Sequence, residues 1–207
     1  MSRIAILGAS GQLGDHLLSE GLEAGWLVHA LSRDPSKIRK TNERLTIFQG
    51  DTERGEGLEA LVTGCRYIIY AVDSTRPEDC VAHLVHAVGW KVVERIIFVS
   101  RPGAATVSRT AKAVGALTAF LPKALQPAQH NARAEELLRV SGLPYCVFRV
   151  TGLTDEPHGQ ELVITEGNEA PPGSVGRADL ARFIIKSLGD RSWNLREVTV
   201  GAKRRMQ

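Results

Sequence analysis

The feature that most constrains this chain is a glycine-rich turn, GASGQLG at positions 8–14, which joins an apolar run to a helical pattern. The apolar run Arg3–Leu7 predicts a buried strand, and the periodicity that begins at Gln12 predicts a helix. Glycine recurs at every third position of the turn, where the lack of side chains permits an unusual backbone and the close approach of a second group. The sequence therefore predicts a strand–turn–helix unit that holds something against its main chain.

The rest of the chain repeats this alternation of strand and helix. The predicted strands are Arg3–Leu7, Trp26–Ser32, Leu45–Asp51, Tyr67–Val72, Arg95–Ser100 and Tyr145–Val150. The predicted helices are Gln12–Ala24, Leu58–Thr63, Pro77–Gly89, Ala128–Ser141 and Gly176–Leu188. Several strands are apolar at nearly every position, which indicates a parallel sheet covered by helices on both faces. We expect the α/β class with a doubly wound parallel sheet, whose ligands bind beyond the carboxyl ends of the strands.

The chain is expected to form one domain over residues 1–207, with a small substrate-side lobe built from its late loops. Two irregular stretches, Arg101–Gln129 and Thr151–Gln160, interrupt the alternation of strand and helix. We expect both stretches to fold over the site at the edge of the sheet.

Composition excludes several classes of partner. A net charge of +3 and an aromatic content of 5% provide neither a basic nucleic-acid face nor a stacking surface. A strand begins by the third residue, and no apolar run approaches the roughly 20 residues of a membrane helix. We expect a cytoplasmic protein, monomeric or homodimeric, that binds a small-molecule substrate and neither nucleic acid nor membrane.

The cysteines and histidines do not suggest a metal centre. Cys65, Cys80 and Cys146 are far apart in the sequence and predict buried, reduced thiols. His83 and His86 lie three positions apart on a predicted helix, but no third ligand accompanies them. No metal site is expected.

The glycine turn predicts a bound dinucleotide. Gly8 is placed for the tight turn, Gly11 for close contact with a diphosphate, and Gly14 for packing of the helix on the strand. The unpaired N–H groups at Gln12 and Leu13 lie at the positive end of the helix dipole, where an anion is stabilised. The spacing is GxxGxxG rather than GxGxxG, and the strand–turn–helix context supports the interpretation.

The end of the second predicted strand favours NADP(H) over NAD(H). Ser32 stands where a carboxylate would bind the ribose hydroxyl, while Arg33 and Lys37 supply positive charge for a 2′-phosphate. The guanidinium of Arg33 can also stack on the adenine. Asp34 is predicted to cap a short helix before a proline. Asp51 has two possible roles, as acceptor from the adenine amino group or as a turn residue.

This order of motifs resembles the atypical short-chain dehydrogenase/reductases that bind NAD(P)H, in particular the biliverdin reductase B/flavin reductase type and the NmrA-like proteins. The resemblance continues through IIFVS, AEELLRVSGLPYCVFRVTGL and GSVGRADLARFIIKSL, and so covers essentially the whole chain. It implies a Rossmann fold that binds NADP(H), with the nicotinamide near Ser100 and the loop after Val150. Substrate would enter beneath the two irregular stretches.

Candidate cofactor-binding residues come from the glycine turn and the strand ends. They are Gly8, Ser10, Gly11, Gln12, Leu13, Gly14, Arg33, Asp51, Thr52, Ala71, Val72, Ser100, Val150 and Thr151.

The sequence lacks the dyad that short-chain dehydrogenases usually use. That dyad is a Tyr and a Lys four residues apart on the helix after the fifth strand, where the Tyr donates a proton. Alignment on AEELL places Pro127 and Asn131 at these positions. None of Tyr67, Tyr70 and Tyr145 precedes a Lys at that spacing.

Ser100 and His130 are therefore the candidate catalytic residues. Ser100, at a strand end, can donate to a carbonyl or contact the nicotinamide, or it can simply terminate the strand. His130 lies beside the missing Lys position, and histidine as a residue type can donate a proton near neutral pH; the alternative is an exposed helix histidine. Arg149 and Thr151 are left with two roles, contact with the nicotinamide carboxamide or a structural function.

These features predict an NADP(H)-dependent oxidoreductase that transfers hydride to a small planar acceptor, such as a carbonyl, quinone or flavin-like compound. The missing dyad leaves a second hypothesis open, a non-catalytic NADP(H)-binding regulatory or assembly protein. An epimerase-like enzyme is disfavoured because it would normally use the same dyad.

Overall fold

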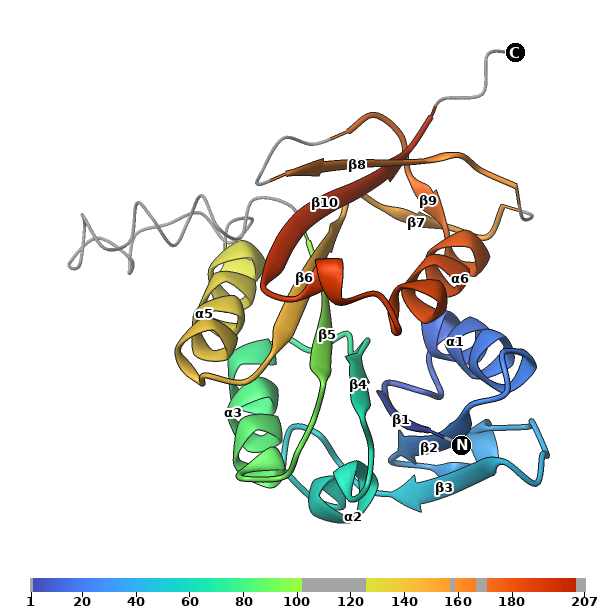
Figure 1. Cartoon of the computed structure of the whole chain (residues 1–207), viewed down its shortest axis with the longest axis vertical. Helices are drawn as coiled ribbons and strands as arrows, with labels where there is room; N and C mark the ends of the chain where they lie inside the picture. The colour runs from blue at the N-terminus through green and yellow to red at the C-terminus, as the bar shows by residue number, and fades with distance from the viewer. Residues whose placement is uncertain (1, 102–125, 157–158, 167–170, 204–207) are drawn as a thin grey trace.

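The computed structural model describes residues 2–101, 126–156, 159–166 and 171–203 (Figure 1). The strands are β1 (Arg3–Leu7), β2 (Leu27–Ser32), β3 (Leu45–Gln49), β4 (Tyr67–Tyr70), β5 (Arg95–Ser100), β6 (Tyr145–Val150), β7 (Leu153–Thr154), β8 (Leu162–Glu166), β9 (Val175–Gly176) and β10 (Arg196–Ala202). The helices are α1 (Gln12–Glu23), α2 (Leu58–Val62), α3 (Pro77–Val88), α5 (Gln126–Val140) and α6 (Arg177–Ser187), with 3-10 turns η1 (Pro35–Lys37) and η4 (Arg191–Trp193).

The main sheet runs in the order β3-β2-β1-β4-β5-β6-β10-β8. Neighbouring strands are parallel except at the edge, where β8 pairs antiparallel with β10. Leu7 at the end of β1 is level with Leu31 of β2 and Tyr70 of β4, so these strands end at one edge of the sheet. The strand order reverses at β1, and the glycine turn that follows β1 therefore lies at the switch point where doubly wound sheets bind ligands.

Helices cover both faces of the sheet, with α1 and α6 on one face and α2, α3 and α5 on the other (Figure 1). Alternate residues of one strand enter the two cores: Ile4 and Ile6 pack toward α1 and α6, whereas Ala5 and Leu7 pack toward α2 and α3. Every residue of β6 is buried, as a strand covered on both faces requires. The predicted Rossmann-type α/β fold is confirmed.

The late part of the chain differs most from the prediction. All six predicted strands are present, but β8 and β10 add two more to the main sheet, and β10 lies parallel to β6. The predicted loop Thr151–Gln160 contains β7, which pairs with β9 in a small second sheet. Most of the predicted irregular stretch Arg101–Gln129 lies outside the described residues, although α5 begins at Gln126.

Candidate functional site

A cavity of about 1250 Å³ lies along the carboxyl edge of the sheet. It begins at the glycine turn, passes the ends of β2, β3 and β4, and reaches β5, α5 and the start of α6. Of the predicted site residues, the lining contains Gly8, Ser10, Gly11, Gln12, Leu13, Arg33, Asp51, Thr52, Ala71, Val72, Ser100, His130, Val150 and Thr151. The structure therefore brings the predicted cofactor-binding and catalytic residues to one cavity, with Gly14 outside its lining.

The glycine turn has the geometry of a main-chain cradle. Gly8 has φ of +83°, and a Cβ there would lie 2.4 Å from the carbonyl oxygen of Ala71. A Cβ on Gly14 would lie 2.1 Å from the carbonyl oxygen of Gly8, so this glycine allows α1 to pack on the turn. Gly11 is the N-cap of α1, and no side-chain hydrogen bond caps the helix. The first N–H groups of α1 therefore remain available at the cavity, and the turn fits a bound diphosphate.

The ends of β2 and β3 form the next part of the cavity. The Ser32 hydroxyl donates to the carbonyl oxygen of Asp34 (2.8 Å) and accepts from the N–H of Asp34 (3.2 Å), so it is held by local contacts at the end of β2. Asp34 caps η1 as predicted, and its hydrogen bond from Ser36 lowers the pKa of its carboxyl. Arg33 is exposed and lines the cavity. Asp51 accepts from the N–H of Glu53 (2.9 Å), which is the turn role of its two predicted roles.

Ser100 belongs to a buried network of charged side chains. Its hydroxyl donates to Glu135 Oε1 (2.7 Å), so the hydroxyl hydrogen is directed at a side chain of the protein. Glu135 Oε2 accepts from Arg149 Nη2 (2.6 Å), and the same nitrogen donates to Glu197 Oε2 (2.7 Å). Arg149 is fully buried and outside the cavity lining, so it takes the structural role.

Each charged side chain of this network lies against one of opposite charge. Burial alone would lower the pKa of Arg149, but hydrogen bonds to Glu135 and Glu197 raise it above its usual range. Burial raises the pKa of Glu135, and the adjacent guanidinium opposes that rise. The guanidinium therefore stays charged and holds Glu135 against Ser100.

His130 is anchored rather than freely exposed. Its Nδ1 lies 2.5 Å from Glu78 Oε1 on the neighbouring helix α3. A carboxylate acceptor places the proton on Nδ1 and leaves Nε2 as the second polar atom of the ring. The other oxygen, Glu78 Oε2, is buried without a hydrogen-bond partner among the described residues.

Thr151, Tyr67 and Tyr145 have structural partners. The Thr151 hydroxyl donates to the carbonyl oxygen of Gly173 (2.6 Å), although Thr151 lines the cavity. Tyr67 donates to Glu94 and Tyr145 to Glu197, while Tyr70 is buried. No tyrosine is found in the described lining of the cavity.

Sequence reasoning missed several lining residues, among them Asp73–Thr75 and Arg177. Asp73, Ser74 and Thr75 follow β4 and share its edge of the sheet, so their position after a predicted strand was a usable signal. Arg177 enters the cavity from the first position of α6. Its motif was noted in the sequence, but the pairing of β9 with β7 that brings it to the cavity left no recognised signal.

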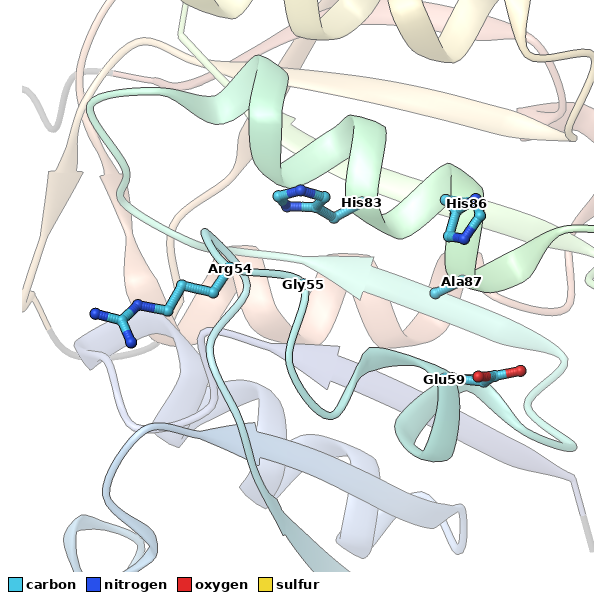
Figure 2. Close-up of a pocket in the computed structure, with 6 residues that line it drawn as sticks. All are labelled: Arg54, Gly55, Glu59, His83, His86 and Ala87. Carbon is cyan, nitrogen blue, oxygen red and sulfur yellow. The ribbon is translucent and has the colours of Figure 1, made fainter.

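A second, smaller hollow of about 270 Å³ lies between α3 and the loop after β3 (Figure 2). His83 faces this loop from α3, His86 lies further along the same helix near Ala87, and the side chain of Arg54 extends away from both (Figure 2). His83 Nδ1 lies 3.4 Å from the carbonyl oxygen of Thr52 and so braces the loop.

No group of three metal-binding side chains occurs in the described part of the chain. All three cysteines, Cys65, Cys80 and Cys146, are free and buried, which confirms their predicted state. Among the described helices, none has the length and apolar character needed to cross a membrane.

Comparisons with known proteins agree with this geometry. A family model described as NAD(P)H-binding matches residues 8–191. The photosystem II assembly factor Ycf39 of Cyanophora paradoxa is 27% identical over 229 residues, covering 94% of this chain but only 66% of that protein. A dihydroflavonol 4-reductase of Hordeum vulgare is 30% identical over 90 residues, which is 37% of this chain and 25% of that protein.

Solved structures share the fold at low sequence identity. ChuY, an anaerobillin reductase from Escherichia coli O157:H7, has a TM-score of 0.81 at 20% identity, with 100% of both chains covered. A short-chain dehydrogenase/reductase from Veillonella parvula, solved in complex with NADP, has a TM-score of 0.77 at 23% identity, covering 97% of this chain and 94% of that one. The match over residues 8–191, together with the glycine turn at the switch point of the sheet, shows that this chain belongs to the NAD(P)H-binding family with a Rossmann fold.

Proposed function

We propose that the protein is an NADP(H)-dependent oxidoreductase that reduces a small planar acceptor, such as a carbonyl, quinone or flavin-like compound. The observation that supports this proposal is the single cavity that joins the glycine turn to Ser100 and His130. A dinucleotide bound at the turn would extend toward the ends of β5 and β6, where an acceptor could lie beside it. When bound, NADPH supplies the hydride for the reduction.

The preference for NADP(H) over NAD(H) is part of this proposal. Arg33 and Lys37 both line the cavity beyond β2 and both are exposed, so a 2′-phosphate can reach them without moving the backbone. A guanidinium and an ammonium bind a phosphate by charge-assisted hydrogen bonds. No carboxylate stands at Ser32 to accept from a ribose hydroxyl.

The chain's own residues would position the reactants and supply a proton. The main chain of Gly11–Leu13 would bind the diphosphate. The Ser100 hydroxyl donates its hydrogen bond to Glu135, so toward the reactants its oxygen can act only as an acceptor. Reduction of a carbonyl needs one hydride and one proton, and a His130 ring protonated at both nitrogens can give the Nε2 proton while Glu78 holds Nδ1–H. Positioning would contribute more to the rate than acid catalysis does.

A second candidate function is binding of the dinucleotide without turnover, in a regulatory or assembly protein. Two observations favour it: no tyrosine occurs in the described lining of the cavity, and one relative is an assembly factor. This hypothesis predicts nucleotide binding with no consumption of NADPH.

The two functions are separated by a binding and turnover assay on one sample. NADPH fluorescence is titrated first, and absorbance of the reduced nicotinamide is then followed with menadione, FMN and a series of aldehydes. If the protein is an oxidoreductase, NADPH binding should be saturable, and NADPH consumption should be lower in His130→Ala and Ser100→Ala than in the wild type. Saturable binding with consumption no greater than in buffer for every acceptor would instead favour the non-catalytic protein.

A further inference from the structure

Arg177 is a cation at the end of the cavity that faces the proposed acceptor. It opens α6, its side chain is only 16% exposed, and it lies in the cavity lining. The neighbouring lining segment, Val150–Leu153, carries no charge. Arg101 is a second lining cation, but its side chain is 65% exposed and pairs with Asp73. Arg177 therefore supplies the sheltered positive charge at this end.

The guanidinium of the partly exposed Arg177 makes fewer hydrogen bonds than those of the buried arginines Arg95 and Arg149. Arg95 gives hydrogen bonds to three acceptors, and Arg149 bonds to two glutamates. Arg177 Nη1 donates to Asp155 (2.6 Å), and no other hydrogen bond of this guanidinium occurs within the described residues. Asp155 is itself 71% exposed and lies outside the cavity lining.

A sheltered guanidinium whose one counter-ion is exposed can exchange that counter-ion for an anionic group of a ligand. A pair between an exposed carboxylate and an arginine is weak because water screens and competes for it. The planar fork of arginine matches the two oxygens of a carboxylate or a phosphate, which a ligand in the cavity can present. We propose that Arg177 binds an oxyanion of the cavity ligand, and that Asp155 occupies the guanidinium when no ligand is bound.

Two sources could provide this oxyanion. Helices α1 and α6 lie side by side (Figure 1), Arg182 of α6 pairs with Glu20 of α1, and both helices begin at the cavity. Arg177 is therefore placed to reach a diphosphate held at the first turn of α1. A carboxylate on the acceptor is the other source, and this alternative rests on the proposed oxidoreductase function.

The test is calorimetric and needs no turnover. Arg177→Gln, Asp155→Asn and the control Arg101→Gln are titrated with NADP⁺ and with adenosine 2′-monophosphate, which has no diphosphate. Each variant saturated with NADP⁺ is then titrated with 4-carboxybenzaldehyde and with benzaldehyde. Thermal unfolding checks each variant, and Arg177→Lys, which keeps the charge without the fork, replaces Arg177→Gln if that variant does not fold.

The proposal predicts opposite effects of the two main variants. Arg177→Gln should weaken binding of the anionic probe by about tenfold or more, whereas Asp155→Asn should strengthen binding of the same probe. Loss confined to NADP⁺ identifies the diphosphate, and loss confined to 4-carboxybenzaldehyde identifies an acceptor carboxylate. If neither probe responds to Arg177→Gln, or if both variants shift binding in the same direction, the proposal is wrong. Arg177-dependent binding without NADPH consumption would support this inference while contradicting the oxidoreductase.

Discussion

The two ends of the cavity are built by different means. The glycine-turn end is made of main chain within positions 8–14, and its important property is the absence of side chains. The opposite end is made of side chains held by partners far away in the sequence: Ser100 by Glu135, 35 positions away, and His130 by Glu78, 52 positions away. The first end is formed by one short segment of the sequence, whereas the positions of the side chains at the second end depend on the packing of α3, α5 and β6.

This difference predicts that nucleotide binding and the proposed reaction can change independently in this chain. Substitutions in the turn should act on the backbone and on nucleotide affinity, while substitutions in the buried network should act first on stability. The following experiments test that separation, beginning with the largest expected effect.

Removal of the Glu135 carboxylate should be the most damaging change. Glu135→Ala leaves the guanidinium of Arg149 buried with Glu197 as its remaining acidic partner, and breaking a buried pair costs about 3–5 kcal/mol of unfolding free energy. Urea denaturation measures this loss. The control is Glu136→Ala at the next position, where the pair with Arg139 is half-exposed and the expected loss is about 0–1 kcal/mol. Equal losses in the two variants would contradict a buried network.

Gly14→Ala should cause the next largest loss of unfolding free energy. Its Cβ would lie 2.1 Å from the Gly8 carbonyl oxygen, so the backbone must shift, at a cost of about 3 kcal/mol. Gly11→Ala is the matched control because its Cβ would meet the same oxygen at 3.2 Å. Thermal and urea unfolding should separate the two variants clearly. Similar destabilisation in both would mean that the turn is not packed as described.

Arg33→Ala should change nucleotide choice rather than stability. Loss of a charge-assisted contact with the 2′-phosphate should weaken the binding of NADPH by about 1–3 kcal/mol and leave the binding of NADH nearly unchanged. Fluorescence titration with both nucleotides measures the difference. Arg39→Ala is the control, because Arg39 is exposed and outside the described lining of the cavity. Equal weakening of the two nucleotides would remove the argument for a phosphate contact.

The smallest effect concerns acid stability. Burial would raise the pKa of Glu197, but hydrogen bonds from Arg139 and Arg149 outweigh it and lower that pKa below its ordinary value. A carboxyl whose pKa is lowered by folding contributes stability above its unfolded pKa of about 4.3 and loses it as the pH falls further. Urea unfolding between neutral and acidic pH should therefore show a shallower decline in Glu197→Gln than in the wild type.

A matched surface variant sharpens the pH test. Glu59→Gln removes a carboxyl that is 83% exposed and should leave the wild-type pH dependence unchanged. If Glu197→Gln and Glu59→Gln follow the same curve, the network does not hold Glu197 in its ionised form.

The same contrast explains what the sequence could predict. Strands β1, β5 and β6 were predicted at their observed bounds because apolar runs covered on both faces leave a strong local pattern. The turn was predicted because its three glycines all lie within positions 8–14. β8 and β10 were not predicted, since one is a partly exposed edge strand and the other follows a 3-10 turn without a long apolar run.

The partners of the candidate catalytic residues could not be predicted for a physical reason. Whether Ser100 donates to a ligand or to Glu135 depends on how α5 packs on β5 and β6, and no local pattern encodes that contact. Arg149 presented the same difficulty, because its partner Glu197 lies 48 positions away on the unpredicted strand β10. Arg177 was missed because β7 and β9, two residues each, bring the start of α6 to the cavity.

The most direct test of the central claim is a calorimetric titration of NADPH into the wild type and Gly11→Ala. The wild type should give saturable one-to-one binding. Gly11→Ala should unfold at nearly the wild-type temperature yet bind NADPH more weakly, because its methyl group intrudes where the diphosphate meets the first N–H groups of α1. No heat of binding with either NADPH or NADH in the wild type, or equal affinity in the two proteins, would contradict a dinucleotide held by the main chain of this turn.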